Sequence, residues 1–414
     1  MVSAIESAES EFFYEAVTRA SERLLLTRPR LADDGAPWQA SPFWEETCRL
    51  LTVTPQTLTT ESVPAADQIA SWPELAEALA ADESTGALRA WAETTHPERW
   101  TALEAATRVL RARQSNGLSP YEGDLTGLAD QISQRFGPDH VWSASRLETY
   151  RSCPFRFFTQ NVLGLEPRPD AIEGLDVSQL GTIYHRILEL VYRQAADRPD
   201  LNALLAALPE VARQVLDEAP EREGFRATAW WSQTRAEIVE TIRQSLTALA
   251  ELPDEFRPIG FEQKFWADQE LTVEAVEGAG VFRLHGVIDR IDQADDDRLR
   301  VIDYKTGGPS SFTKRDLEKG KKLQLPLYAL AARDALHLGT PVEGFYWHVR
   351  HAEPSEFTLA SGAEAAMARA AEYAWEAVDG VRHGRFTPQP PADGCPDYCP
   401  ATGFCWRYRP AYHE

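Results

Sequence analysis

Three side chains in one part of the chain have the types and spacing of a site that hydrolyses bonds with the help of a metal. Asp303 and Lys305 lie two residues apart in an apolar run that begins at Val301, so on a strand both side chains point to the same face. Asp289 ends a preceding apolar run, and the acidic stretch between the two runs is typical of a turn. In a hairpin centred on Asp296, Asp289 and Asp303 lie opposite each other, because each is seven residues from the centre.

Two carboxylates and one ammonium group in this arrangement suit the hydrolysis of phosphodiesters. Carboxylate oxygens are hard ligands that fit Mg²⁺ or Mn²⁺. The metal polarises the phosphate and lowers the pKa of a water, and the lysine orients that water or stabilises the developing charge. By itself, however, Asp-x-Lys is more often part of an ordinary exposed hairpin. The prediction therefore depends on further residues.

Polar side chains before and after this stretch can complete such a site. His185 lies off the apolar stripe that Ile183 and Ile187 form on a predicted helix. It can therefore reach a metal beside the sheet, although a lone histidine is more often a surface or hydrogen-bonded residue. Gln324 and Tyr328 are four residues apart on a second predicted helix and face the same way.

In this order, the pieces resemble the RecB-type branch of the PD-(D/E)XK nuclease superfamily. The matching motifs are the histidine at position 185, Gly-x-x-Asp-Arg over 286–290, Asp-Tyr-Lys-Thr-Gly over 303–307 and Gln-x-x-x-Tyr over 324–328. The resemblance implies that Mg²⁺ or Mn²⁺ binds to His185, Asp289 and Asp303. It also implies that Lys305 is the catalytic lysine, acting with the two aspartates, and that the site is lined by Gln324 and Tyr328.

Four of the five cysteines form a second set of candidate ligands: Cys153, Cys395, Cys399 and Cys405. Four thiolates suit Zn²⁺ or an iron–sulfur cluster. The C-x3-C-x5-C spacing at the C-terminal end differs from the common C-x2-C zinc knuckle, which weakens the case for zinc. The remaining Cys48 is predicted to be a buried helix residue.

The run Ser145-Arg146-Leu147-Glu148 precedes the first of these cysteines. Together they resemble the [4Fe-4S] staple of AddB-type nuclease domains, which has one cysteine before the nuclease core and three after it. The resemblance implies a [4Fe-4S] cluster on Cys153, Cys395, Cys399 and Cys405. Such a cluster would close a very long loop and tie the two ends of the domain together.

The segment from Phe13 to Leu24 resembles the final motif of superfamily 1, UvrD-like helicases, with Arg19 at the position of the arginine that contacts the γ-phosphate. The sequence has no G-x-x-x-x-G-K-[S/T] phosphate loop, so this chain is not a complete ATPase. In AddB-type subunits a helicase-like part precedes the nuclease domain. The resemblance therefore implies a helicase or helicase–nuclease partner subunit.

The elements that must position these residues alternate between helix and strand. Helices are predicted over 180–193, 231–252, 323–336 and 363–378, and strands over 262–266, 282–293, 299–305 and 342–350. This order predicts an α/β fold with a mixed central β-sheet flanked by helices, preceded by a mainly helical N-terminal segment. The resemblance implies that the α/β part is a restriction-endonuclease-like core. The expected divisions are 1–30, a helicase-motif-like remnant; 31–140, a helical and linker region; and 141–414, the nuclease domain with its cysteine staple.

Composition limits the function classes. The chain has 414 residues, of which 43% are hydrophobic and 26% charged, as in soluble globular proteins of two or more domains. It has no apolar stretch of membrane-spanning length and its start lacks the features of a signal peptide, so we expect no membrane association and a cytoplasmic location.

The net charge of -22 disfavours binding of nucleic acid by the whole surface. A local basic channel can still form. Its candidate residues are Lys314, Arg315, Lys319, Lys321 and Lys322. An ordinary solvated loop would explain this run of charges about as well.

These observations favour a Mg²⁺-dependent DNA exonuclease that acts on single strands and is fed by a partner helicase during double-strand-break processing. Single-strand specificity comes from the resemblance alone. A second hypothesis is a noncatalytic iron–sulfur scaffold that binds DNA or a helicase without cleaving, although intact Asp289, Asp303 and Lys305 argue against it. A third is a redox or zinc protein built around the four cysteines, which would have no metal-dependent cleavage.

Overall fold

The computed structural model of the chain describes residues 4–32, 36–57, 69–81, 86–114, 119–166, 174–195, 200–252, 255–276, 279–308 and 312–410. The chain divides into two compact units, unit 1 over residues 1–107 and unit 2 over residues 108–414. In the described part of the chain, no helix is long and apolar enough to cross a membrane.

Unit 1 is helical, which confirms the prediction of a mainly helical N-terminal segment. Its helices are α1 (Ala4–Thr18), α2 (Pro42–Leu51), α3 (Trp72–Ala81), α4 (Gly86–Thr95) and the first part of α5 (Pro97–Gln114). A small core of Leu75, Leu79, Ala92 and Trp100 holds α3, α4 and α5 together.

Two predictions about single residues fall in unit 1. Arg19 is exposed just after α1, and its guanidinium lies 3.9 Å from the Glu15 carboxylate. Cys48 lies in a helix as predicted, but the prediction that it is buried is wrong. It is half-buried, and no other residue of α2 is buried either.

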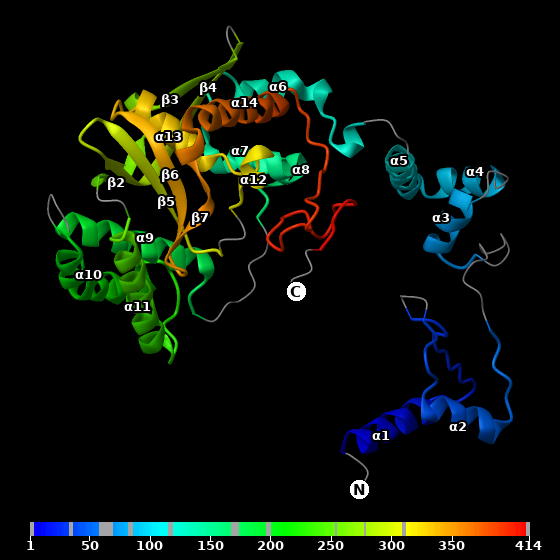
Figure 1. The fold of residues 1–414 in the computed structure, drawn as a ribbon. Coiled ribbons are helices and arrows are strands. Elements are labelled where there is room, and N and C mark those ends of the chain that lie inside the picture. Colours follow the sequence, from blue (N-terminus) through cyan, green and yellow to red (C-terminus); the bar gives the residue numbers. More distant parts are fainter. Residues whose placement is uncertain are drawn as a thin grey trace. The chain divides into compact units, whose positions relative to one another are not determined.

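A seven-stranded mixed sheet forms the centre of unit 2 (Figure 1). Its strands are β1 (Val141–Ser143), β2 (Arg257–Phe265), β3 (Leu271–Val276), β4 (Ala279–Gln293), β5 (Arg298–Lys305), β6 (Thr340–His348) and β7 (Glu353–Thr358). The order is β1-β4-β5-β6-β7, and β2 and β3 also pair with the long β4. The β1–β4 and β5–β6 pairs are parallel and the others antiparallel. The predicted mixed α/β fold is therefore confirmed.

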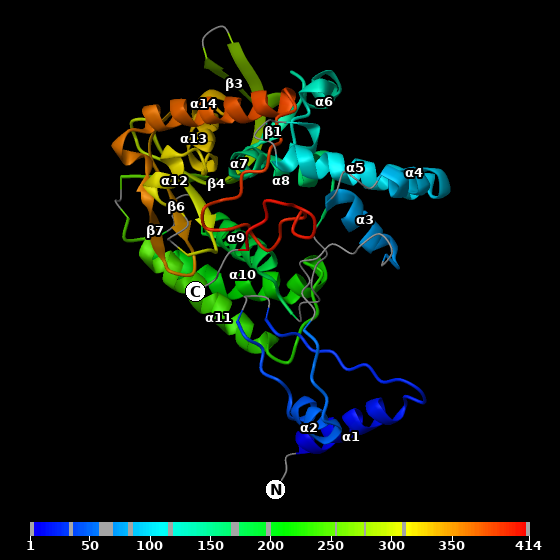
Figure 2. The ribbon, with the colours of Figure 1, turned by 90° about the vertical axis from the view of Figure 1, so that its right-hand side faces the viewer.

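Helices cover both faces of this sheet (Figures 1 and 2). One face packs against α6 (Ala129–Phe136), α7 (Ala144–Ser152), α13 (Gln324–Asp334) and α14 (Ala363–Arg382). The other packs against α9 (Val177–Gln194), α10 (Leu201–Arg222) and α11 (Trp231–Leu249). Shorter helical segments are η1 (Pro120–Glu122), η2 (Thr126–Leu128), α8 (Pro154–Phe157), η3 (Phe158–Val162), η4 (Ala267–Gln269), α12 (Lys314–Glu318) and η6 (Leu359–Ser361). Sequence analysis missed α6, α10, β1, β3 and β7.

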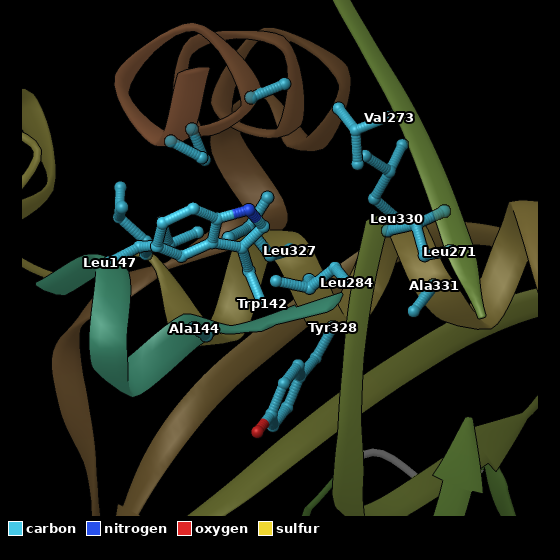
Figure 3. Packing of buried hydrophobic residues seen from close by; sticks show 14 of the residues in the cluster. Trp142, Ala144, Leu147, Leu271, Val273, Leu284, Leu327, Tyr328, Leu330 and Ala331 are labelled. Carbon is cyan, nitrogen blue, oxygen red and sulfur yellow. The ribbon is translucent and has the colours of Figure 1, made fainter. Parts of the chain in front are cut away.

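The core beneath α7 and α13 fixes both helices to the sheet. Trp142 of β1 is fully buried there, in one cluster with Leu147 of α7, Leu284 of β4 and Leu327 of α13 (Figure 3). Because interior side chains are close-packed, this cluster leaves little freedom in the position of either helix. The polar residues at the ends of α7 and α13 are therefore held at fixed places beside the sheet.

The path of the chain brings the start of α13 to the end of β5. Strand β5 is buried along almost its whole length, as expected for a central strand covered on both faces. Its neighbour β6 runs parallel, which requires a crossover connection, and α13 lies in that connection. A helix in such a crossover begins near the carboxyl end of the strand before it. Lys305, at the end of β5, and Gln324, at the start of α13, are therefore brought together.

The hairpin formed by β4 and β5 has the predicted register. Arg290 pairs with Ile302 and Asp292 pairs with Arg300, so the hairpin is centred on position 296. The prediction that positions 289 and 303 lie opposite each other is therefore confirmed.

Candidate active site

Three carboxylates lie in one row across the sheet. The register of β2 on β4 places Glu262 opposite Asp289, and the β4–β5 hairpin places Asp289 opposite Asp303. Glu262 has a φ of 47°, in the left-handed region that residues other than glycine rarely adopt. Such backbone strain persists only where the surroundings enforce it, and it is concentrated at functional sites.

Glu262 and Asp289 converge on His185 of α9. The His185 Nδ1 atom lies 3.4 Å from Glu262 Oε1 and 3.5 Å from Asp289 Oδ1. Each of the three residues offers one ligand atom within 4.8 Å of the others, so the group can hold a metal ion. His185 and Asp289 were expected from the sequence as ligands, but Glu262 was missed.

The backbone of Tyr304 orients two of these ligands. Its N–H donates to Asp289 Oδ2 at 2.6 Å, and its carbonyl oxygen lies 3.1 Å from His185 Nε2. When Nε2 carries the proton it donates to this carbonyl, and the lone pair of Nδ1 then faces the two carboxylates. That tautomer is the one a metal ligand needs, and a backbone hydrogen bond on the far nitrogen is the usual way to select it.

Asp303 and Lys305 form the second half of the site. Lys305 Nζ lies 2.5 Å from Asp303 Oδ2 and donates to Gln324 Oε1 at 2.8 Å. Gln324 Nε2 in turn donates to the hydroxyl of Tyr328 at 3.2 Å. Asp303 is fully buried, and its Oδ1 atom has no hydrogen-bond partner among the described residues. A buried acceptor without a donor is costly unless a cation satisfies it, so this oxygen fits a metal ligand.

The electrostatics of the site follow from this crowding of charge. Burial alone would lower the pKa of His185, but the carboxylates of Asp289 and Glu262 raise it to about 10. Burial raises the pKa of Asp303 to about 7, against the opposite effect of Lys305. Burial also raises the pKa of Asp289, but His185 and Lys305 outweigh it and hold this pKa below its ordinary value. Burial would lower the pKa of Lys305, and Asp303 and Asp289 raise it instead. The site thus favours positive charge among its carboxylates.

Two further residues hold the predicted pair on α13. The Glu148 Oε1 atom of α7 accepts hydrogen bonds from the N–H groups of Leu323 and Gln324, at 2.6 and 3.0 Å, and so caps the start of α13. Gly286 lies under Tyr328, and a Cβ atom there would stand 2.9 Å from the tyrosine ring. Neither role was predicted from the sequence, although Glu148 lies in the run of residues next to Cys153 that carried the resemblance.

The four predicted cysteines line one cavity, apart from this site, between the α7–α8 junction and the C-terminal segment. None of the four forms a disulfide bond with another described residue. Cys153 Sγ accepts a hydrogen bond from the Gln389 N–H at 3.4 Å, and Phe155 contacts the rings of Phe404 and Trp406. Four thiols around one cavity can hold a metal ion or cluster.

Residues 141–406 match the model of the PD-(D/E)XK nuclease superfamily. Similar proteins include a subunit of the ATP-dependent helicase/deoxyribonuclease of Moorella thermoacetica, 32% identical over 254 residues, which are 57% of this chain and 21% of that protein. The protein of the same name from Leuconostoc citreum is 26% identical over 379 residues, 85% of this chain and 31% of that protein. The one from Symbiobacterium thermophilum is 28% identical over 366 residues, 77% and 29% respectively.

The chain thus spans about a fifth to a third of the length of these relatives. The segment that matches the superfamily model contains every candidate residue of the sheet site and all four cysteines of the cavity. It also covers more than half of the chain. The chain belongs to the PD-(D/E)XK nuclease superfamily.

Proposed function

We propose that unit 2 is a metal-dependent DNA nuclease that hydrolyses phosphodiester bonds at the sheet site. The observation that carries this proposal is the convergence of His185, Glu262 and Asp289 beside the Asp303–Lys305 ion pair. Membership of a nuclease superfamily supports it, and so does the word deoxyribonuclease in the names of the relatives.

The residues that would hold the metal are His185, Glu262, Asp289 and Asp303. Mg²⁺ or Mn²⁺ suits this set, because three of the four donors are carboxylate oxygens. When bound, a divalent cation would lower the pKa of an attacking water and offset the negative charge of the phosphate. The sheet register and the Tyr304 backbone hold the ligands in place beforehand, so little reorganisation is needed.

Lys305 supplies the ammonium group of the proposed mechanism. The neighbouring carboxylates raise its pKa, so it stays protonated and can donate to a phosphate oxygen or orient the attacking water. Gln324 fixes Nζ from one side and Asp303 from the other. The hydroxyl of Tyr328 holds the Gln324 amide, so the pair on α13 acts by positioning the lysine.

The finer parts of the proposal rest on the resemblance. We propose exonucleolytic action on single strands, fed by a helicase or helicase–nuclease partner during double-strand-break repair. The relatives are named as subunits of an ATP-dependent helicase/deoxyribonuclease, which supports a partner. A [4Fe-4S] cluster on Cys153, Cys395, Cys399 and Cys405 is supported by the one cavity that all four cysteines line. The cytoplasmic location stays a prediction.

The test is degradation of end-labelled single-stranded DNA with Mg²⁺ and with EDTA. The parent is compared with Lys305→Ala and Asp303→Ala, and with Glu210→Gln on the exposed surface of α10 as a matched control. We expect cleavage by the parent and the control, and its loss in the two site variants and in EDTA. Equal activity in all four proteins would refute the site.

Two additions test the finer parts. Circular single-stranded DNA of the same sequence separates exonucleolytic from endonucleolytic action, because an exonuclease leaves it intact. Binding of DNA by the parent without cleavage, alone or with a helicase partner, would favour the noncatalytic scaffold instead.

A further inference from the structure

The lysines of the chain are concentrated in the segments next to the sheet site. The chain has six lysines, and five of them lie between residues 305 and 322. The sixth, Lys264, lies two residues after Glu262 on β2. The remaining basic residues are arginines spread along the whole chain. An ammonium group binds phosphate oxygens as a compact point charge, and the guanidinium fork binds both carboxylates and phosphates.

The two kinds of cation also differ in their partners. Arginines such as Arg213, Arg235 and Arg333 pair with carboxylates. By contrast, within the part of the chain that the structure describes, four lysines have no carboxylate within 4.0 Å: Lys314, Lys319, Lys321 and Lys322. The nearby Asp316 carboxylate instead accepts hydrogen bonds from the backbone N–H and the hydroxyl of Thr313. In a chain with a net charge of -22, a run of unpaired cations is unexpected unless it meets an anion from outside.

The backbone that carries these lysines is fixed in place. The Arg151 guanidinium donates to the carbonyl oxygens of Lys319 and Gly320, at 3.1 and 3.4 Å. The Tyr373 hydroxyl donates to the Glu318 carbonyl at 2.5 Å. Gly320 has a φ of 65°, and a Cβ atom there would stand 2.6 Å from the Tyr373 ring. The segment is therefore anchored to α7 and α14, unlike a freely solvated loop.

The last lysine of this segment lies near the candidate catalytic lysine. The Lys322 Nζ atom lies 4.6 Å from the centre of the Phe312 ring, and Lys305 Nζ lies 5.9 Å from the same ring. Phe312 also packs on Tyr346 at 4.5 Å, and Tyr346 lies opposite Asp303 in the sheet. One aromatic pair thus connects the row of carboxylates to the end of the lysine run.

We propose that Lys314, Lys319, Lys321 and Lys322 form a track that holds the sugar–phosphate backbone of the DNA strand on one side of the bond to be cut. This inference rests on the proposed function, because it assigns the binding of the strand that the sheet site cleaves. Contacts to phosphates carry no sequence information, so the track binds strands of any sequence. It also gives a strongly acidic chain one local surface for a polyanion.

The test measures DNA binding without cleavage. A fluorescein-labelled single strand of twenty thymidines is titrated with protein in EDTA at several salt concentrations. The variant Lys314→Gln/Lys319→Gln/Lys321→Gln/Lys322→Gln is compared with a control of equal charge change, Arg213→Gln/Arg222→Gln/Arg235→Gln/Arg243→Gln on α10 and α11. Each phosphate contact contributes about 0.7 to the slope of log K against log salt for single strands, so the lysine variant should lose about 2 to 3 in slope. Its affinity at low salt should fall at least ~100-fold, while the arginine control stays within about threefold of the parent.

Three outcomes decide the proposal. A shallower slope in the lysine variant alone supports the track. Equal slopes in parent and lysine variant overturn it, and so does an equal loss in lysine and arginine variants, because only net charge would then matter. The pairs Lys314→Gln/Lys319→Gln and Lys321→Gln/Lys322→Gln should each lose about half of the effect, which guards against misfolding of the full variant. Because binding is measured in EDTA, failure of the track is separate from failure of the parent to cleave DNA with Mg²⁺.

Discussion

The sheet site and the cysteine cavity of unit 2 gather their residues in opposite ways. Apart from His185 and the pair on α13, the sheet site comes from neighbouring strands, and register alone fixes the row of Glu262, Asp289 and Asp303. The cavity joins Cys153 to Cys395 across roughly 240 residues of sequence. Removing one ligand from the sheet site should therefore cost chemistry and leave the fold. If the proposed cluster closes the domain, removing one thiol from the cavity should cost the fold.

The largest expected effect is from Cys399→Ala. If the cavity holds a [4Fe-4S] cluster, the variant should lose the broad absorption near ~400 nm and its solubility together. A cross-link that closes a loop of more than 100 residues contributes about 5 kcal/mol in the chain-entropy model. Absorption spectra and thermal unfolding measure both losses.

Cys48→Ala is the matched control, because Cys48 lies in α2 of unit 1. A stable, fully active Cys399→Ala protein would contradict the staple, and a colourless parent with bound zinc would identify a zinc site.

The second prediction concerns Glu262→Gln, at the sheet site. The amide keeps the shape of the side chain but loses the charge that faces His185 and the metal. We expect affinity for Mn²⁺ to fall on the order of 100-fold, with little change in unfolding temperature. Calorimetric titration measures the affinity, and Glu255→Gln, beside Arg298, is the control. Unchanged affinity would show that Glu262 is not a ligand.

The third prediction tests how closely the sheet site is packed. In Gly286→Ala, the new methyl group would lie 2.9 Å from both Phe265 and Tyr328. Overpacking of this kind costs about 1–3 kcal/mol, and it should also displace Tyr328 and weaken the positioning of Lys305. Gly127→Ala is the control, since nothing lies within 4 Å of a Cβ atom there. Denaturant unfolding checks the stability, and equal stability of the two variants would mean that the packing adapts.

The same contrast explains what the sequence could predict. Asp289, Asp303 and Lys305 were found because strand period and hairpin symmetry act over a few residues, and the register of β4 on β5 confirms that reasoning. The pair Gln324 and Tyr328 followed from helical spacing, and the hydrogen bond between them confirms that they face each other. Strand-level reasoning thus covered the centre of the site.

What the sequence could not predict depends on contacts between distant segments. Glu262 was missed because its place opposite Asp289 depends on the pairing of β2 with β4 and on a strained backbone that no local pattern indicates. The helix α10 was missed although Asp200 caps its start, because Pro209 and Pro220 lie inside it and such residues usually break helices. The choice of an iron–sulfur cluster for the four cysteines came only from a family resemblance, since their spacing allows zinc as well.

The smallest expected effect is a pH dependence of stability that belongs to the sheet site and not to the cysteine cavity. Without metal, the carboxylates around His185 raise its pKa to about 10, against the effect of burial. Because this folded-state pKa lies above the unfolded value of about 6.5, the stabilisation is full below pH 6.5 and is lost as pH rises towards 10. The unfolding free energy of the EDTA-treated protein should therefore fall between pH 7 and 9, by at most about 1.4 kcal/mol per pH unit.

A divalent cation should remove this dependence, because it takes the place of the proton on His185. Binding of Mn²⁺ at pH 8 should then release close to one proton, measured by calorimetry in buffers of different ionisation enthalpy. His185→Asn should flatten the pH dependence and abolish the proton release, whereas His383→Asn, on the exposed end of α14, should change neither. If the cavity holds a cluster, its absorption should stay constant through the same titration, since its ligands are separate from the sheet site. Proton release that persists in His185→Asn would place the titrating group elsewhere and leave His185 without its proposed role as a ligand.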